Sequence, residues 1–197
     1  MSIEISAYDK FKPISNARGR GNYGSVYKYK DEVIKLFKDD KLIKQCNIEE
    51  NLKKIIDSKI KIDGVALPTN LVYKNNKFSG YTMPYFNGPT LTMLLGKISK
   101  KKVLFNENEL YNLYFSLVEK IKKLSKNNIK ANDIKPDNII YYNGELCLVD
   151  CDAYKIVDMK NLEEYNLSLL DKCFKKIDIF KNVIYKDDLK VERNKVK

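Results

Sequence analysis

The sequence predicts an α+β fold in which a small, β-rich N-terminal part with one helix precedes a shortened, mainly helical C-terminal part. Strand-like runs gather before Gly88-Pro89, one helical stripe lies among them, and longer helical stripes follow. With 197 residues, 44% of them apolar, the chain can bury a core without disulfides. We expect an N-terminal part over residues 1–87, a C-terminal part over 88–185 and a charged tail over 186–197.

The N-terminal part predicts a strand meander, a helix and a hairpin. Within residues 14–38, glycines precede an alternating strand, and a tight turn at Lys30-Asp31 leads into a strand over 33–37. A helix is expected over 40–58. Its apolar residues recur at helical spacing: Leu42, Cys46, Leu52 and Ile56. Asn75-Asn76 then forms the turn of a hairpin.

The C-terminal part predicts a short helix over 91–95, a long helix, a hairpin and a last helix over 161–181. Asn106 can cap the long helix in a capping box with Glu109, three residues further on. The core stripe of this helix is Leu110, Leu113, Leu117, Ile121 and Leu124. Asn143-Gly144 is a typical hairpin turn between two short apolar runs.

Charge and composition exclude several classes of function. The net charge is +11, but the lysines are spread along the whole chain and arginine is scarce. A nucleic-acid reader concentrates its charge and includes arginine, so this pattern predicts a solvated surface and argues against nucleic acid as a partner. Histidine is absent, which excludes histidine metal sites and Ser-His triads.

The four cysteines show no metal-binding spacing. Cys147 and Cys151 flank an apolar run, where a thiol is usually a small buried side chain. No apolar run approaches the length of a membrane span, and no secretory segment follows Met1. We therefore expect a reducing, cytoplasmic setting and no membrane partner.

The first motif that carries chemistry is Gly19-x-Gly21-x-x-Gly24-x-Val26. Glycines between two strands let the backbone approach phosphates and point its N–H groups at them. A strand follows the motif, where a dinucleotide-binding fold would need a helix. The order of glycine loop, strand and Val33-x-Lys35 is typical of kinases.

Lys35 lies in an apolar strand and shares a face with Val33 and Phe37 by alternation. A lysine on an apolar face needs an anionic partner or ligand. Both Glu49 and Glu50 occur on the following helix. Glu49 falls on its apolar stripe, so we predict that Glu49 pairs with Lys35 and keep Glu50 as the alternative.

The strongest motif runs from Asn132 to Ile140. It places Asp133, Lys135 and Asn138 within six residues, after a long helix and before a strand. The aspartate can orient a hydroxyl and accept its proton, the lysine can hold a phosphate, and the asparagine amide oxygen can bind Mg²⁺. Asp150, which ends the second strand of the following hairpin, is a candidate second metal ligand.

In this order, the motifs resemble the eukaryotic-type Ser/Thr protein kinase family over residues 19–152. The resemblance implies a two-lobed protein-kinase-like fold that binds ATP and Mg²⁺. Its implied catalytic residues are Asp133, Lys135, Lys35 and Glu49. Its implied metal ligands are Asn138 and Asp150. Thr82 to Phe86 resembles the hinge that holds adenine. The residues implied to bind ATP are Gly19, Gly21, Gly24, Val26, Val33, Lys35, Met83, Tyr85, Phe86 and Ile140.

The sequence departs from the family pattern in two places. The His-Arg-Asp triplet is replaced by Ala131-Asn132-Asp133, so no arginine is present to pair with a phosphorylated activation loop. The Asp-Phe-Gly triplet is replaced by Asp150-Cys151-Asp152. About ten residues separate Asp152 from the last helix, so the activation segment and later helices are expected to be missing or vestigial.

The prediction from these residues is an atypical, minimal kinase that transfers the ATP γ-phosphate to Ser/Thr hydroxyls of a protein acceptor or of itself. A partner protein or self-association would then help to supply acceptor affinity. One alternative is a pseudokinase that binds ATP or a partner. The other is a small-molecule kinase, although such enzymes lack the lysine-proline pair after the catalytic aspartate.

Overall fold

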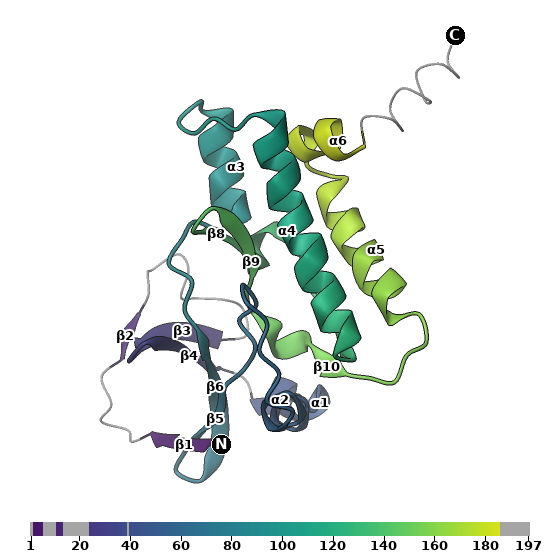
Figure 1. Cartoon of the computed structure of the whole chain (residues 1–197). Helices are drawn as coiled ribbons and strands as arrows, with labels where there is room; N and C mark the ends of the chain where they lie inside the picture. The colour runs from purple at the N-terminus through teal and green to yellow at the C-terminus, as the bar shows by residue number, and fades with distance from the viewer. Residues whose placement is uncertain (1, 6–10, 14–23, 39, 186–197) are drawn as a thin grey trace.

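The computed structural model describes residues 2–5, 11–13, 24–38 and 40–185, which form an α+β fold (Figure 1). The strands are β1 (Ser2–Ile5), β2 (Lys12–Pro13), β3 (Gly24–Tyr29), β4 (Glu32–Phe37), β5 (Asn70–Lys74), β6 (Lys77–Pro84), β7 (Ile129–Lys130), β8 (Ile139–Tyr142), β9 (Glu145–Leu148) and β10 (Lys155–Ile156). The α-helices are α1 (Asp40–Gln45), α2 (Ile48–Asp57), α3 (Leu91–Ser99), α4 (Glu107–Lys126), α5 (Leu162–Phe174) and α6 (Asp178–Ile184). Two short 3₁₀ helices are η1 (Pro136–Asn138) and η2 (Cys151–Ala153). The predicted α+β class is confirmed, and the predicted tail lies outside the described residues.

A mixed six-stranded sheet forms the N-terminal part, in the order β1-β5-β6-β4-β3-β2. Only β1 and β5 pair in parallel; the other neighbours are antiparallel. The predicted turns are confirmed at Lys30-Asp31 and at Asn75-Asn76. Both asparagines have positive φ, 52° and 57°, which suits the twist of a tight hairpin. The edge strands β1 and β2 were not predicted.

Two glycines let the sheet close tightly around Lys35, which lies on the central strand β4. A Cβ atom at Gly80 would lie 1.9 Å from the carbonyl oxygen of Lys35. A Cβ atom at Gly24 would lie 2.7 Å from the carbonyl oxygen of Leu36 and 3.3 Å from Cε of Lys35. Any larger residue at either position would therefore push apart the strands that position this lysine.

The prediction of a single helix over 40–58 is wrong, because the chain forms two helices, α1 and α2, with a break between them. Asn47 has φ of 49° in the left-handed region, which an α-helix cannot accommodate. Cys46 was expected in the core but is exposed at this break. Leu52 and Ile56 are buried, and they hold α2 against the sheet in an apolar cluster with Val33, Leu71, Tyr81 and others.

The long helix α4 confirms the predicted start after Asn106 and the predicted apolar stripe. The Asn106 side chain accepts from the backbone N–H of Glu109 at 2.9 Å, and the Glu109 carboxylate accepts from the backbone N–H of Asn106 at 2.7 Å. The predicted stripe, all of it buried, is Leu110, Leu113, Leu117, Ile121 and Leu124. These residues form the largest core of the described chain together with α3, α5 and α6.

The prediction of a single last helix over 161–181 is also wrong. The chain folds into α5 and α6, which both pack against α4 (Figure 1). The bend between them lets Phe174 and Phe180 meet edge to face with ring centroids 4.8 Å apart, and both rings are fully buried. Burial of two aromatic rings in one corner outweighs the continuity of the helix. Helix α3 is longer than predicted and is capped by Thr90, whose hydroxyl accepts from the N–H of Met93 at 3.3 Å.

The predicted hairpin at Asn143-Gly144 is confirmed as β8 and β9. It lies between the loop that follows β7 and the short helix η2, so it brings these two segments to the same region, where the Asn132 side chain donates to the carbonyl oxygen of Ala153. Both segments carry predicted site residues. Among the described helices, none is long and apolar enough to cross a membrane.

Candidate active site

The first part of the site is the loop between β7 and β8. Its sharp path depends on Asp133, which has φ of 56°, a left-handed conformation that aspartate tolerates better than most residues. Pro136 begins η1, where its missing N–H costs no hydrogen bond. Asn138 ends η1 with a buried side chain. The loop therefore holds three predicted site residues in a fixed order.

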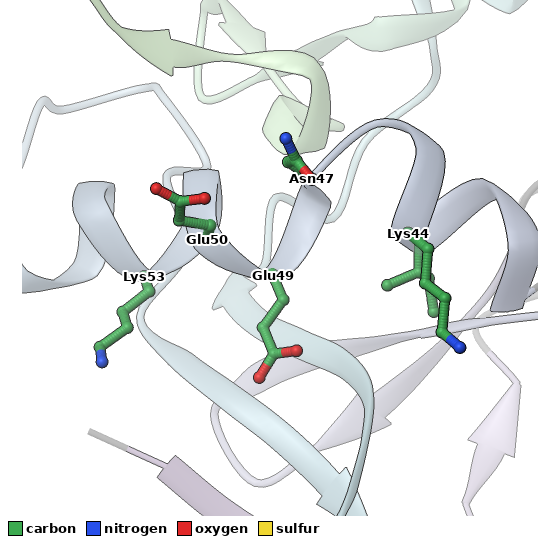
Figure 2. A pocket seen from close by; sticks show the side chains of 6 residues that line it. Lys44, Asn47, Glu49, Glu50 and Lys53 are labelled. Atoms are coloured by element: carbon green, nitrogen blue, oxygen red, sulfur yellow. The ribbon is translucent and has the colours of Figure 1, made fainter.

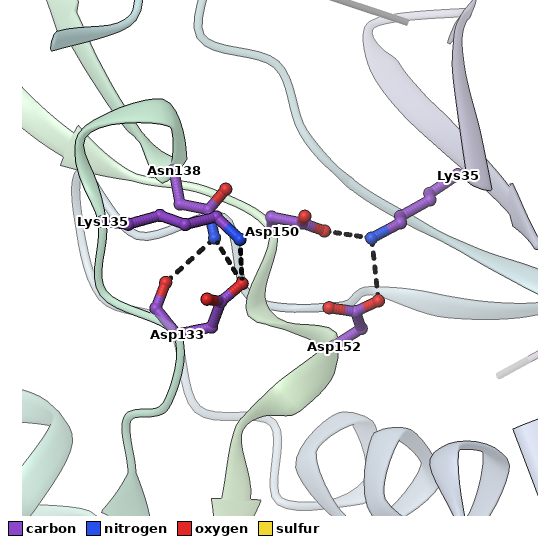
Figure 3. Close-up of polar contacts among 6 residues, drawn as sticks. All are labelled: Lys35, Asp133, Lys135, Asn138, Asp150 and Asp152. Carbon is purple, nitrogen blue, oxygen red and sulfur yellow. Dashed lines mark hydrogen bonds and ion pairs between the residues drawn. The ribbon is translucent and has the colours of Figure 1, made fainter. Parts of the chain in front are cut away.

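Asp133 is the centre of this loop (Figure 3). Lys135 Nζ donates to its Oδ2 at 2.6 Å. The amide nitrogen of Asn138 donates to the same Oδ2 at 3.0 Å and to the Asp133 carbonyl oxygen at 2.9 Å. The hydrogen bond to Asp133 raises the pKa of Lys135 above its ordinary value, so this lysine stays charged. The structure thus brings Asp133, Lys135 and Asn138 together.

The second part of the site is a buried ion cluster that joins the sheet to η2. Lys35 Nζ, from β4, donates to the carboxylates of Asp150 and Asp152, the latter at 2.8 Å (Figure 3). Burial opposes the charge of Lys35, but the attraction of the two carboxylates outweighs it, so its pKa is raised. Burial, reinforced by the charge of Asp150, raises the pKa of Asp152 despite the opposing effect of Lys35.

The two parts together suit a divalent cation. One lysine faces two aspartates in the buried cluster, so its formal charge is −1. The amide nitrogen of Asn138 is used on Asp133, and its oxygen points away from that contact (Figure 3). That oxygen and the Asp150 carboxylate are hard oxygen donors of the kind that Mg²⁺ prefers.

Within the described residues, no three or more His, Cys, Asp or Glu side chains gather as a metal site. Mg²⁺ is commonly held by only one or two carboxylates and by substrate phosphates, so it needs no such cage. Asn138 and Asp150 therefore fit this ion in kind.

The structure does not bring Glu49 to Lys35. The Glu49 carboxylate accepts a hydrogen bond from the Tyr73 hydroxyl at 2.6 Å, which raises the pKa of Tyr73 to about 12. The alternative, Glu50, is exposed and pairs with Lys54 at 2.8 Å. The expectation assumed one continuous helix, whereas the break at Asn47 resets the direction in which α2 presents its first turn.

A shallow hollow lies beside this first turn of α2 (Figure 2). Its volume is about 330 Å³, and its lining residues are Ile43, Lys44, Asn47, Glu49, Glu50 and Lys53. Figure 2 shows Glu49 and Glu50 leaving the helix in different directions. The hollow contains neither Lys35 nor any residue of the Asp133 loop, so it is separate from the site.

The residues predicted to bind ATP lie in several places. Gly19 and Gly21 lie outside the described residues, and Gly24 begins β3. One apolar cluster holds most of the others, namely Val26, Val33, Met83, Tyr85 and Phe86. Ile140 lies on β8, where it bridges to Thr90 beyond the end of β6. The structure therefore gathers five of the residues predicted to bind ATP in one apolar cluster.

Two residues of the site were not predicted. Asp152 was noted only as part of the altered triplet, although its spacing of two from Asp150 was a usable signal. Tyr81 pairs across the strands with Lys35, is fully buried, and its hydroxyl has no hydrogen-bond partner in the described part of the chain. Burial first, and then the charges of Asp152 and Asp150, raise the pKa of Tyr81 well above its ordinary value.

No protein-family model matches the chain. Among curated proteins, the chain is similar to calcium-dependent protein kinase 6 of Plasmodium berghei (strain Anka), with 30% identity over 173 residues. The match covers 83% of this chain but 10% of the kinase, so the chain spans about a tenth of that protein's length. The α+β fold is compatible with a kinase-like two-lobed arrangement, and the chain is distantly similar to a protein kinase.

Proposed function

We propose that this chain is an ATP- and Mg²⁺-dependent phosphotransferase that transfers the γ-phosphate of ATP to Ser/Thr hydroxyls of a protein. One observation carries the proposal. The structure collects Lys35 and Asp150, which are 115 residues apart, into one ion cluster. It also builds a hydrogen-bonded Asp133 loop of the composition that phosphoryl transfer requires. The distant similarity to a protein kinase supports the same reaction class.

Asp133 is suited to hold the acceptor. Its Oδ2 is fixed by Lys135 and Asn138, while its side chain remains 46% exposed, so a hydroxyl can approach it. In the proposed step, the acceptor oxygen attacks the γ-phosphorus and gives its proton to Asp133. The bond from the γ-phosphorus to the bridging oxygen breaks, and ADP leaves with that oxygen. Lys135 would move from Asp133 to steady the transferring phosphoryl group.

Lys35 is suited to hold the inner phosphates. Its raised pKa keeps it cationic, and its anchorage on a central strand fixes its position. The apolar cluster of Val26, Val33, Met83 and their neighbours would contact the adenine. Catalysis of phosphoryl transfer depends mainly on positioning and charge neutralisation, and these residues supply both.

Asn138 and Asp150 would hold the metal. When bound there, Mg²⁺ would supply positive charge that neutralises the phosphates as charge builds on the leaving oxygen. The net negative charge of the buried cluster favours a cation at this place. Asp150 would exchange at least part of its contact with Lys35 for the metal.

A pseudokinase is the second candidate, and one observation favours it. Each of the two functional aspartates is paired with a lysine, Asp150 with Lys35 and Asp133 with Lys135. Such pairing is also what a chain that never binds metal would need in order to keep its carboxylates satisfied. Metal-dependent turnover of ATP separates the two candidates.

The test is to incubate purified protein with ATP labelled at the γ-phosphate, Mg²⁺ and generic Ser/Thr protein acceptors. We expect label on an acceptor, or on the chain itself, with Mg²⁺ and none with a chelator. Asp133→Asn is the matched variant, because it keeps size and shape but cannot take a proton. The same labelling in the variant, or none in the unaltered protein, would refute the proposal.

A further inference from the structure

The partner of Lys35 is the feature from which we draw a further inference. A buried ammonium must keep a carboxylate partner, because leaving it unpaired away from water is strongly unfavourable. The side chain of Lys35 is 6% exposed. Glutamate was expected to supply this partner from α2, but Glu49 is bonded to Tyr73 and Glu50 to Lys54. Both partners in the structure come instead from the segment that follows β9.

These two partners differ in access to solvent. The Asp150 side chain is 35% exposed, whereas that of Asp152 is 16% exposed. Asp150 is therefore the one that can turn to a metal and nucleotide. Asp152 is the one that would stay with Lys35 when Asp150 does so.

The backbone around Asp152 is anchored on both sides. Cys151 and Tyr154 are both buried in the largest core. The Asn132 side chain donates to the carbonyl oxygen of Ala153 at 2.8 Å, which ties η2 to the Asp133 loop. Helix α2 also packs against η2. A carboxylate on so short and fixed a segment can define where a lysine head group lies.

We propose that Asp152 is the positioning residue for Lys35, the role that the sequence had assigned to Glu49. This inference rests on the proposed function, in which Lys35 holds the inner phosphates of ATP. The position of Lys35 is then set within the site by η2. It does not depend on the placement of the first turn of α2.

The first test uses Asp150→Asn as a background, because this variant imitates an Asp150 that no longer pairs with Lys35. Lys35 modification by an amine-acylating N-hydroxysuccinimide ester is followed by mass spectrometry. Adding Asp152→Asn should raise the rate of modification by about fivefold or more, since it removes the last carboxylate partner. Adding Glu49→Gln should change the rate by less than about twofold, as should the surface control Glu119→Gln. Equal rates in all the double variants, or a rise with Glu49→Gln alone, would overturn the proposal.

The second test uses transfer kinetics and does not depend on the stability of a double aspartate variant. Asp152→Asn alone should lower kcat and raise KM for ATP in the same direction as Lys35→Met. Combining Asp152→Asn with Lys35→Met should add little to Lys35→Met alone, because the two residues act as one unit. Full additivity, or parental kinetics in Asp152→Asn, would contradict the assignment. If the unaltered protein transfers no phosphate, the proposed function fails, while the labelling experiment still decides whether Asp152 holds Lys35.

Discussion

The candidate site contains two aspartate–lysine clusters that differ in almost every physical respect. Asp133 and Lys135 are two residues apart, and about half of each side chain is exposed, 46% and 47%. Lys35 is 115 and 117 residues from its partners Asp150 and Asp152, and only 6% of its side chain is exposed. One cluster is a local loop motif, and the other exists only once the sheet and the helical part have come together.

This difference in burial predicts which cluster can change partners during a reaction and which cluster stabilises the fold. An exposed ion pair contributes about 0.2–1 kcal/mol to folding, whereas breaking a buried pair costs about 3–5 kcal/mol. The Asp133 cluster is therefore free to change partners during a reaction. The Lys35 cluster joins two parts of the chain and tolerates less change.

The largest expected effect distinguishes the two clusters by activity. Asp133→Asn should lower phosphate transfer by about 10²–10⁴-fold, the usual contribution of a positioned proton acceptor, and leave ATP binding nearly unchanged. Asp150→Asn should weaken Mg²⁺-dependent ATP binding and transfer together. Transfer rates with labelled ATP and calorimetric titration with Mg·ATP measure both.

The two variants check each other because each exchanges a carboxylate for an amide of the same size. A loss of ATP binding in Asp133→Asn, equal to that in Asp150→Asn, would show that the clusters do not divide the work in this way. Far-ultraviolet circular dichroism must show parental helix content in both variants.

The next effect concerns stability. Lys35→Met should lower the free energy of unfolding by about 3–5 kcal/mol, because it removes the buried cation that the two partly buried carboxylates, Asp150 and Asp152, share. Lys135→Met should lower it by less than about 1 kcal/mol. Urea denaturation of the two variants at neutral pH measures the difference, and equal losses would remove the distinction between the clusters.

The pH dependence of the same effect follows from the raised pKa of Lys35. A lysine whose pKa is raised by folding contributes fully below its unfolded value, which is about 10.4. That contribution is lost as the pH rises through the higher folded value. The difference in free energy of unfolding between the unaltered protein and Lys35→Met should therefore be constant near neutral pH. It should become smaller only in strong alkali. If this difference in free energy already becomes smaller between pH 6 and 9, roughly one to four units below the pKa of an unfolded lysine, the assigned role of Lys35 is wrong.

The same comparison shows what the sequence could and could not predict. The Asp133 loop, the capping box at Asn106 and the turns at Asn75-Asn76 and Asn143-Gly144 were predicted correctly in their placement, because each is set by neighbouring residues. The break at Asn47 was missed, since the apolar spacing across it imitates one continuous helix. Local periodicity does not register a single left-handed residue.

The partner of Lys35 could not be predicted by the same reasoning. Helix-face arguments compared Glu49 with Glu50 and never included a residue 117 positions away. Asp152 becomes a partner only because folding brings η2 to the Lys35 side chain of β4, a tertiary event with no local signature. The usable sign in the sequence was a second carboxylate two residues from Asp150.

A smaller effect, the stabilisation of the fold by ATP, tests whether the nucleotide and Mg²⁺ bind at both clusters. We expect ATP with Mg²⁺, at ~100 times its dissociation constant, to stabilise the fold by about 2.7 kcal/mol. ATP with chelator should stabilise it much less, because the net negative buried cluster would then face the phosphates without a cation. Thermal unfolding with and without chelator measures the difference. ADP without metal is the control, and equal shifts in all samples would count against a metal shared by Asn138 and Asp150.

The smallest expected effect probes whether the buried cluster is dry. Tyr81 lies across the strands from Lys35, is fully buried, and its hydroxyl has no hydrogen-bond partner in the described residues. Tyr81→Phe removes that hydroxyl and keeps the ring, so it should be neutral or should stabilise the fold by about 1 kcal/mol, since an unsatisfied buried polar group is unfavourable. Thermal and urea unfolding measure the change, with Tyr73→Phe as the matched control. The Tyr73 hydroxyl does have a partner, Glu49, so its loss should destabilise the fold by about 0.5–1.5 kcal/mol.

If Tyr81→Phe destabilises the fold as much as the control, a water must bridge the Tyr81 hydroxyl to the acidic cluster. Lys35 would then lie in a hydrated site, and the energetic contrast with the exposed Asp133 loop would shrink accordingly.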